Sequence, residues 1–349
     1  MQIIVNSMLK ENLKKIKKIL LLCVIGSILT AFIPFSIVKG WNASYVKWKQ
    51  QINEYEGVIS EFSDGNDIVS VLNNDEVITL DMFEYICSVV AAEMPPSYHE
   101  EALKAQAVAS YSFTLYHINN LGQSQELDSA HKGAAVCTNP AHCKAYLSKT
   151  QAREKWGEEY FEKLWAKVEN AVSSVYKKAA CFDGEPINAA FFAISAGKTE
   201  DAQDVWGNEV PYLKSVDSSF DKSYPQYMST VKISVEEFKI KLKESIDISF
   251  TDNHKEWISD IVRSSAGGVK SLKICSAELK GSELRSILGL RSSNFEIVTN
   301  DDSFTFNVFG YGHDVGMSQT GAQYLALEGK NYEEILKWYY TGIEIIDMI

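Results

Sequence analysis

Residues 88–113, SVVAAEMPPSYHEEALKAQAVASYSF, decide the fold, because two helical patterns meet there at Glu93. The first helix is predicted to begin after Asp81, a capping residue, with Glu84 at the third position of a capping box. Apolar residues then recur at helical spacing up to the proline pair at 95–96, which ends the helix. Glu93 is therefore expected between a helix and a rigid turn.

The second helix is predicted over residues 98–118, in the core of the protein. Ser97 is interpreted as its cap, and Glu100 follows three residues later, as in a second capping box. Small residues fill the helix interior, so it can pack very close to its neighbours. They are Ala102, Ala105, Ala107 and Ala109.

A carboxyl group at this junction is suited to acid catalysis. The negative end of a helix dipole disfavours the charged form of Glu93 and raises its pKa. Partial burial would raise that pKa further, and a general acid working near neutral pH needs such a pKa. The residues alone also allow a plainer interpretation, in which Glu93 only caps or pairs at a solvated turn.

The N-terminal region predicts a membrane anchor. Residues 19–38, ILLLCVIGSILTAFIPFSIV, hold no charge over 20 positions, which is enough for a helix to span a bilayer. Five lysines and one glutamate precede them, so residues 1–18 are expected in the cytoplasm and the rest outside the cell membrane. The alternative is a cleaved signal peptide, but the apolar stretch is long and no clear cleavage site follows it.

The exported part of the chain is acidic. The whole chain carries −12 and residues 1–38 carry +4, which leaves −16 on the remainder. Nucleic acid is not expected as a partner, because its binding needs a basic surface. A near-neutral glycan is compatible with this charge, as are many other ligands.

The other elements are predicted from local patterns. Residues 39–75 are interpreted as a spacer and entry module and residues 76–349 as the main domain. Short strands are predicted at 68–72 and 77–80, on either side of a turn at Asn73-Asn74. Further predictions are a helix over 151–180, a hairpin turn at Asp183-Gly184, a helix over 281–290, and a scaffold without chemistry over 222–305.

Four potential metal ligands lie within 13 residues of one another: His131, Cys137, His142 and Cys143. Thiolate and imidazole are preferred zinc ligands, and a structural zinc site takes four of them. The spacing is not that of a zinc finger, and two cysteines in an exported domain can also form a disulfide. Spacing alone leaves both interpretations open.

Two polar loops are candidate ligand-binding segments. In FFAISAGKTEDAQDVWG, residues 191–207, Ser195, Gly197 and Thr199 can offer hydroxyl and backbone N–H groups, and Trp206 can stack on a sugar ring or simply pack in the core. In FGYGHDVGMSQTGA, residues 309–322, glycines allow a tight loop around His313, with Ser318 and Gln319 behind it. His313 could contact substrate or hold the loop.

These motifs together resemble the stage II sporulation protein D family. The resemblance rests on EMPPSYHEEALKAQAVA with Glu93 at its head, on the two loops, and on PYLKSVDSSFD at 211–221. It spans about residues 76–345. Members of that family are membrane-anchored peptidoglycan lytic transglycosylases of endospore-forming bacteria, and some clostridial members hold zinc beside the active-site cleft.

The resemblance implies roles for particular residues. Glu93 is expected to be the catalytic acid, and the four-residue cluster at 131–143 is expected to hold Zn²⁺. Substrate contacts are expected from a wider set, namely Glu101, Tyr146, Ser195, Gly197, Thr199, Trp206, His313, Ser318 and Gln319. The fold is expected to be α+β, with two lobes and a central groove lined by the Glu93 turn and the 309–321 loop.

The resemblance also implies a setting. Glycan strands stripped of stem peptides are the expected substrate. An amidase and a membrane protein of the engulfment machinery are the expected partners, at the mother-cell membrane facing the forespore. Three departures from the family pattern bear on substrate fit: Asp314 for glycine, Thr320 for tyrosine, and 110–112 where relatives commonly carry arginine and threonine. Two alternatives stay open, a zinc-dependent wall amidase or peptidase and a non-catalytic glycan-binding scaffold.

Overall fold

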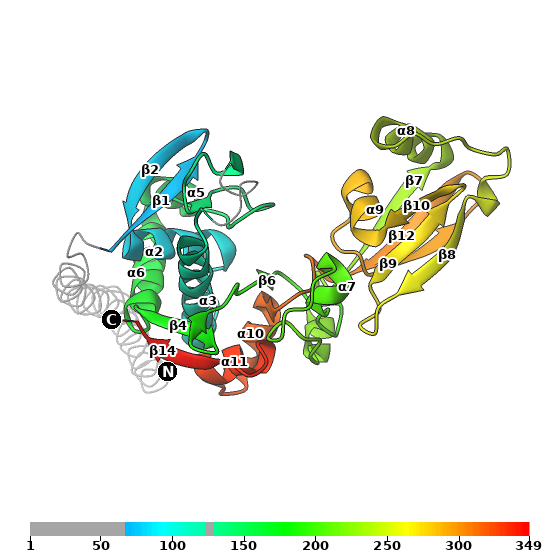
Figure 1. The fold of residues 1–349 in the computed structure, drawn as a ribbon. Helices are drawn as coiled ribbons and strands as arrows, with labels where there is room; N and C mark the ends of the chain where they lie inside the picture. The colour runs from blue at the N-terminus through cyan, green and yellow to red at the C-terminus, as the bar shows by residue number, and fades with distance from the viewer. Residues whose placement is uncertain (1–66, 123–128, 349) are drawn as a thin grey trace, which may run out of the picture. The chain divides into compact units, whose positions relative to one another are not determined.

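The computed structural model describes residues 67–122 and 129–348, which belong to one compact unit, Gly65–Ile349. Helices and several small sheets alternate along the chain, which confirms the mixed α+β class (Figure 1). Each helix in this described part is too short or too polar to cross a bilayer. The predicted anchor at 19–38 lies outside the described residues.

Helix α3 (Glu100–Asn119) is the central element. It packs against α2 (Met82–Glu93), α6 (Glu158–Ser173), α10 (Gln319–Leu327), α11 (Tyr332–Tyr339) and β4 (Lys178–Phe182). The predicted small side chains explain this, since Ala102, Ala105 and Ala109 are fully buried and let neighbouring backbones approach. The prediction of a core helix over 98–118 is confirmed with small shifts at its ends.

The caps of α2 and α3 agree only in part with the prediction. The Asp81 side chain accepts from Glu84 N at 3.0 Å, and Met94 is extended before the proline pair, as expected. Ser97 does not cap α3. His99 does so instead, its Nδ1 accepting from Glu101 N at 3.2 Å.

Small sheets surround α3. Strand β1 (Ile68–Asn73) pairs with β2 (Glu76–Asp81) and with β3 (Val136–Cys137), and β4 pairs with β5 (Glu185–Pro186) and with β14 (Glu344–Asp347). Strand β6 (Phe191–Phe192) pairs in parallel with β13 (Met317–Ser318), which joins the two polar loops. The predicted hairpin turn at Asp183-Gly184 is confirmed, since both residues have positive φ.

The predicted helix over 151–180 is wrong in its extent. The structure has α5 (Lys149–Trp156), then α6, then strand β4. Gly157 has φ 80°, which an α-helix cannot contain, and it therefore separates the two helices.

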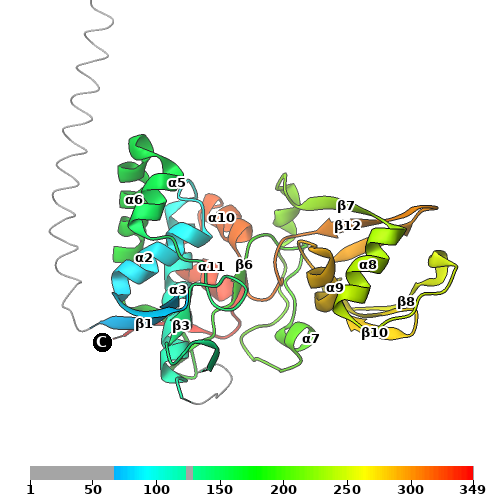
Figure 2. The same cartoon turned by 90° about the horizontal axis from the view of Figure 1, so that it is seen from above.

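Residues 228–309 build two further antiparallel sheets. The first contains β11 (Phe295–Thr299), β12 (Ser303–Phe309) and β7 (Met228–Ser234), and the second β10 (Ala277–Lys280), β9 (Val269–Ile274) and β8 (Ile258–Arg263). Helices α8 (Val235–Ser245) and α9 (Gly281–Leu288) pack on these strands (Figure 2). The predicted helix over 281–290 is thereby confirmed.

This segment has a hydrophobic core of its own. It combines aliphatic side chains with an aromatic group, in which the Phe238 and Phe304 rings lie 4.5 Å apart and Trp257 stacks beside Phe238. Two 3-10 turns, η1 (Ser219–Ser223) and η2 (His254–Glu256), and the short helix α7 (Ala202–Trp206) complete the elements.

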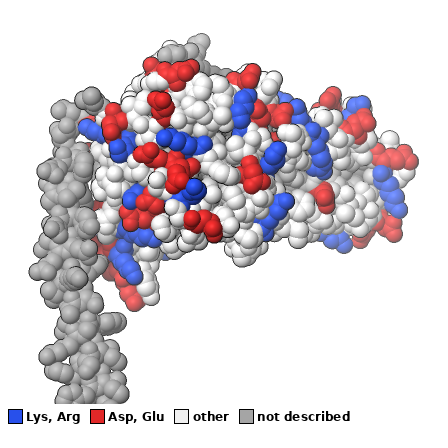
Figure 3. All heavy atoms as spheres, turned by 90° about the horizontal axis from the view of Figure 1, so that it is seen from below, with Lys and Arg blue, Asp and Glu red and all other residues white. Residues whose placement is uncertain are grey.

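Charges of both signs are interspersed on the surface. The face seen in Figure 3 shows acidic and basic side chains side by side, and no broad basic area covers that face. This distribution agrees with the net negative charge of the chain and gives no support there to nucleic-acid binding.

Candidate active site and metal centre

Glu93 is the last residue of α2 and its side chain is partly buried. One carboxylate oxygen, Oε1, accepts a hydrogen bond from Ala145 N at 2.7 Å, and the Gln319 side chain also bonds to the carboxylate. Ala145 and Gln319 come from segments far away in sequence. The structure therefore brings together Glu93, the cysteine- and histidine-containing loop, and the second polar loop.

The pKa of Glu93 is raised from its ordinary value. Burial is the largest cause, and the Lys144 ammonium, Ala145 N–H and Gln319 oppose it. The direction agrees with the prediction for a general acid, although removal from water rather than the helix dipole is the main physical cause.

Lys144 is a site residue that the sequence analysis missed. Its side chain is buried, and its ammonium lies 3.7 Å from the ring centroid of Phe191 and 4.0 Å from that of Phe113. Burial lowers the pKa of Lys144 to about 8, while Glu93 opposes this shift. In the sequence, only its position directly after Cys143 indicated that Lys144 could belong to the site. A cation held over aromatic rings next to a carboxyl can tune the charge of that carboxyl.

A chain of side-chain amides supports Glu93 from behind. Gln319 Nε2 donates to Gln106 Oε1 at 3.2 Å, and Gln106 Nε2 donates to Ser110 Oγ at 3.2 Å. All three side chains are buried. Ser110, one of the departures from the family pattern, therefore fixes the orientation of the amide that holds Gln319.

The other serine of that departure has a different role. Ser112 Oγ accepts from Ala180 N at 2.8 Å and donates to Val108 O at 2.6 Å. Ser112 therefore links α3 to β4, and neither of these two hydrogen bonds involves Glu93.

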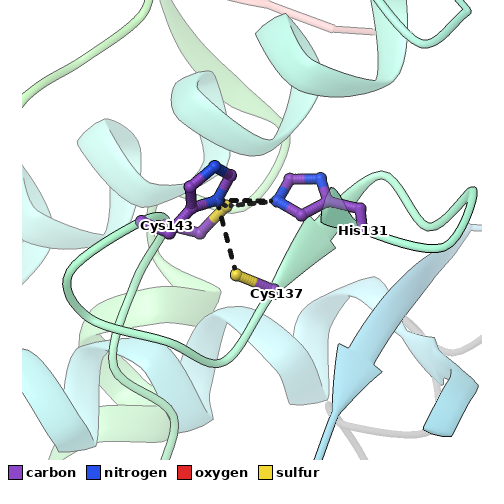
Figure 4. Close-up of side chains that lie close together, drawn as sticks. His131, Cys137 and Cys143 are labelled. Atoms are coloured by element: carbon purple, nitrogen blue, oxygen red, sulfur yellow. Dashed lines mark hydrogen bonds between the residues drawn. The ribbon is translucent and has the colours of Figure 1, made fainter. Parts of the chain in front are cut away.

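The predicted metal ligands converge. The four ligand atoms of His131, Cys137, His142 and Cys143 all lie within 4.8 Å of one another. Figure 4 shows the side chains of His131, Cys137 and Cys143 pointing toward a common centre. His131 Nε2 lies 2.9 Å from His142 Nδ1 and 3.2 Å from Cys143 Sγ, and His142 Nδ1 lies 3.6 Å from each of the two sulfur atoms. Neighbouring ligand atoms in a zinc tetrahedron lie roughly 3.3–3.8 Å apart, given the usual bond lengths.

The donor set fits a structural zinc site. Both cysteines are free thiols in the structure. The Cys143 thiol bonds to Cys137, which lowers the pKa of Cys137 and raises that of Cys143. A zinc ion would take both as thiolates. With His131 and His142 these residues supply the two nitrogen and two sulfur donors of a closed structural site.

Asp221 joins three of the sequence motifs and was not singled out as a site residue. It is fully buried, accepts from Ser195 N at 3.1 Å and Ser218 Oγ at 2.9 Å through Oδ2, and accepts from Thr320 Oγ1 at 2.6 Å. Burial raises the pKa of Asp221, and these donors oppose that shift. Its place at the end of PYLKSVDSSFD was the available signal.

Four predicted substrate residues make internal contacts. Ser195 Oγ accepts from Gly197 N, and Gly197 has φ 115°. Thr199 Oγ1 accepts from Val216 N at 2.8 Å, and Ser318 Oγ caps α10 by accepting from Gly321 N at 3.2 Å. Ser195, Thr199 and Ser318 are fully buried. These contacts favour a role in shaping the loops.

His313 and Trp206 lie together at the second loop. Their rings are 5.5 Å apart, Trp206 is 43% exposed, and His313 also faces Phe192. Burial, then the charges of Lys144 and Arg285, lower the pKa of His313 to about 3, so the imidazole is neutral at neutral pH. An exposed indole beside a neutral imidazole offers a surface for a sugar ring.

Glu101 and Tyr146 lie in structural contacts. Glu101 pairs with Lys104 at 2.9 Å through Oε1 and accepts from Tyr332 N at 2.8 Å through Oε2, which links α3 to α11. Tyr146 stacks on Tyr85 with ring centroids 6.1 Å apart. Contact of these two residues with substrate stays a prediction.

Comparison with known proteins gives the family. The family model described as "Stage II sporulation protein" matches residues 73–181, which include Glu93 and the metal-ligand cluster. Stage II sporulation protein D of Bacillus amyloliquefaciens is 38% identical over 274 residues, and that of Bacillus subtilis (strain 168) is 38% identical over 273 residues. Both alignments cover 78% of this chain and 76% of the relative. The chain belongs to the stage II sporulation protein D family.

Two further relatives share part of this similarity. An uncharacterized protein of Brachyspira hyodysenteriae is 30% identical over 313 residues, covering 84% of this chain and 77% of the relative. The amidase enhancer of Bacillus subtilis is 28% identical over 303 residues, covering 73% of this chain and 39% of the relative. The family model and the two sporulation proteins support a place in sporulation and a cell-wall context.

Proposed function

We propose that the protein is a membrane-anchored lytic transglycosylase of the sporulating cell. It cleaves the bond between N-acetylmuramic acid and N-acetylglucosamine in glycan strands and leaves 1,6-anhydro ends. The observation that carries this proposal is Glu93, a partly buried carboxyl whose pKa is raised and whose position is fixed by Ala145 N and Gln319.

The reaction needs only one carboxyl group. Glu93 in its acid form donates its proton to the glycosidic oxygen, and the bond from that oxygen to C1 of the muramic acid breaks. The resulting carboxylate takes the proton of the C6 hydroxyl on the same sugar, and O6 bonds to C1. Glu93 is thereby reprotonated. Ordinary glycosidases need a second carboxyl to act as nucleophile or base.

The metal-ligand cluster supports this site and takes no part in the reaction. Zinc, when bound, would be held by His131, Cys137, His142 and Cys143, and would supply structural cross-linking of the loop. Four protein ligands leave no position for a reactive water. This donor count favours a transglycosylase over a zinc-dependent amidase or peptidase, which needs an open metal position.

The proposal extends to location and partners. The predicted span at 19–38 would hold the domain at the outer face of the membrane, which by family resemblance is the mother-cell membrane facing the forespore. The similarity to an amidase enhancer supports action together with an amidase. By family resemblance, the strands that are cut have already lost their stem peptides. A membrane protein of the engulfment machinery is the second proposed partner.

The test is mass spectrometry of purified, amidase-treated glycan strands digested by the full chain in detergent. Wild type is compared with Glu93→Gln, which preserves size, and with Glu84→Gln, an exposed glutamate of the same helix. We expect 1,6-anhydro ends from wild type and Glu84→Gln. Loss of a general acid costs about 10²–10⁴-fold in rate, so Glu93→Gln should leave almost no product.

Four results would contradict the proposal. Reducing ends would show that water is the nucleophile. Full activity of a folded Glu93→Gln variant would remove Glu93 from the reaction. Bound but uncut strands would favour the non-catalytic scaffold, and release of stem peptides from untreated wall that a chelator stops would favour a zinc amidase.

A further inference from the structure

Glu200 contains a buried oxygen without a partner. The side chain is only 4% exposed, and its Oε1 accepts from Ser264 Oγ at 2.8 Å and from Gly268 N at 3.0 Å. Across residues 67–122 and 129–348, nothing hydrogen-bonds to the other oxygen, Oε2. Leaving a buried acceptor unpaired costs roughly 1–3 kcal/mol. A ligand or a water molecule that donates to Oε2 would remove this cost.

A second buried carboxyl, Asp314, lies close to Glu200. Asp314 Oδ1 accepts from Ala196 N at 3.2 Å, and its backbone carbonyl accepts from Glu200 N at 2.6 Å. Burial raises the pKa of Asp314, with Glu200 as a further cause, while Arg285 opposes the shift only in part. The pKa of Glu200 is likewise raised by burial and, less, by Asp204. A cationic donor between these carboxyls would therefore be stabilised.

Both carboxyls line one cavity. Its volume is about 580 Å³, and His313, Asp204, Glu283 and Lys270 also line it. Lys270 pairs with Asp204 at 2.6 Å, and its charge lowers the pKa of Glu200 less than burial raises it. The volume falls within the range of about 300–1,000 Å³ that is usual for small-molecule sites.

His313 belongs to this cavity, and the charge of Lys144 acts on it as on Glu93. It also stands beside the exposed Trp206 ring. Under the proposed function, a strand cut at Glu93 would extend past His313 toward the cavity, and Trp206 would offer a flat apolar face for one sugar ring.

We propose that this cavity binds a hexosamine residue of the glycan strand whose amino group is free, with its ammonium directed between Glu200 Oε2 and Asp314. Charge-assisted hydrogen bonds from an ammonium would pair the free acceptor and would favour the charged form of both carboxyls. An acetamido group offers a single neutral N–H and a bulky acetyl group in the same place. This inference rests on the proposed function for the identity of the strand.

A divalent cation is the competing occupant and has less support. In the described part of the chain, His131, Cys137, His142 and Cys143 form a group of three or more residues whose ligand atoms lie close together. Glu200 and Asp314 belong to no such group. The cavity also has the size for a sugar ring, which a bare ion would not fill.

The test measures binding by calorimetry to the full chain in detergent, with Glu93→Gln as background to prevent turnover. The probes are tetra-N-acetylchitotetraose, the fully deacetylated tetramer, and Nα-acetyl-lysine amide, which has an ammonium but no sugar. We expect the deacetylated tetramer to bind at least tenfold tighter than the acetylated one, and the lysine derivative to bind weakly. Adding Glu200→Gln should bring the ratio of the two tetramer affinities close to one.

Controls separate this site from general attraction of a cation to an acidic protein. Glu296→Gln removes an exposed charge from β11 and should leave the affinity ratio unchanged. Asp314→Asn removes the second carboxyl of the cavity and serves as an independent test if Glu200→Gln does not fold. It should also reduce the ratio of the two tetramer affinities. Equal affinities for both tetramers, an unchanged ratio in both cavity variants, or tight binding of the lysine derivative would overturn the proposal.

The result is distinct from the test of the proposed function. Anhydro products from acetylated strands together with equal tetramer affinities would leave the transglycosylase standing and remove the amine site. Selective binding of the deacetylated tetramer without anhydro products would keep the amine site and remove the transglycosylase.

Discussion

Ala145 N donates to Glu93 Oε1 over 2.7 Å, and Ala145 stands two residues after the metal-ligand candidate Cys143. Lys144, the residue between them, places its buried ammonium near the same carboxyl. A single three-residue segment thus carries a ligand of the metal cluster, a cation that acts on Glu93, and a hydrogen-bond donor to it. An interaction that fixes residues 143–145, such as metal binding at Cys143, therefore also affects the position and charge of Glu93.

Replacing Lys144 should change the pH dependence of the reaction. A general acid acts while protonated, so activity is present below the pKa of Glu93 and is lost as pH rises through it. Burial raises this pKa and the Lys144 charge lowers it. Lys144→Met keeps the apolar stem between Phe113 and Phe191 but removes the charge, so the pKa of Glu93 should rise further. We expect the alkaline limb of kcat/KM to move to higher pH.

The pH–rate profile of Lys144→Met is compared with that of Lys149→Met. Lys149 is more than half exposed and pairs with Glu169 at 3.5 Å, so its loss should leave the limb in place. Zinc content is measured in both variants, because Lys144 adjoins Cys143. An unchanged limb, or one displaced to lower pH, would show that Lys144 does not act on Glu93.

Metal removal should loosen the segment that holds Glu93. We expect the purified full chain to contain zinc in an amount equal to the protein, and Cys137→Ser to lose it. The melting temperature should fall, because a ligand bound only to the folded state stabilises that state. Product formation should fall with it, since Ala145 N–H is no longer held against Glu93. Elemental analysis, calorimetric melting and the anhydro-end assay measure the three effects.

Cys275→Ser is the matched control for the metal, because Cys275 is a free cysteine outside the cluster. It should keep the zinc and the melting temperature of the wild type. A purified chain without zinc, whose intact mass is lower by two hydrogens until a reductant is added, would show that Cys137 and Cys143 form a disulfide instead.

Asp221→Asn should destabilise the arrangement of the two polar loops. The carboxylate accepts from Ser195 N, Ser218 Oγ and Thr320 Oγ1, and an amide would turn an N–H group toward some of these donors. Leaving buried polar groups unpaired costs roughly 1–3 kcal/mol each. Denaturant unfolding should show a loss of this size, whereas Asp217→Asn, which affects one exposed bond to Ser219, should lie close to wild type. Equal stability of the two variants would mean that Asp221 does not hold the loops.

The sequence predicted the elements whose signals are local. Asp81 and the proline pair fixed the ends of α2, and small residues fixed the packing of α3. The cap at His99 was missed, because Ser97 has the commoner capping side chain and the bond from Glu101 N to a histidine ring has no sequence signature. The break at Gly157 was missed because the apolar spacing continues across it.

The candidate site divides in the same way. The four metal ligands could be found because their residue types are distinctive and they lie near one another in sequence. Lys144, Gln106 and Asp221 could not, because their roles depend on contacts between segments far apart in the chain. Ser195 and Thr199 were predicted to face a ligand, yet their hydroxyls bond within the loops, since a polar loop must first satisfy its own buried backbone groups.

The departure at Asp314 should carry a cost in stability that depends on pH. Asp314 is buried with φ 63°, and burial raises its pKa well above the ordinary value. A carboxyl whose pKa is raised on folding stabilises the fold below its unfolded pKa of about 3.9, and that contribution is lost as pH rises through the folded pKa. Asp314→Asn removes this loss, and asparagine tolerates the left-handed backbone.

Asp314→Asn should therefore unfold at a higher temperature than wild type at pH 8, with a smaller difference at pH 5. Each unit of pKa shift corresponds to about 1.4 kcal/mol, and for a chain of this size 1 kcal/mol moves the melting temperature by roughly 2–4 °C. Asp260→Asn is the matched control, because Asp260 also has positive φ, at 48°, but is exposed and pairs with Lys273 at 2.8 Å. A gain in both variants would assign the effect to the backbone conformation. A gain confined to Asp314→Asn and growing with pH would show that the wild-type chain keeps a buried carboxyl at the expense of stability, as expected of a residue retained for binding.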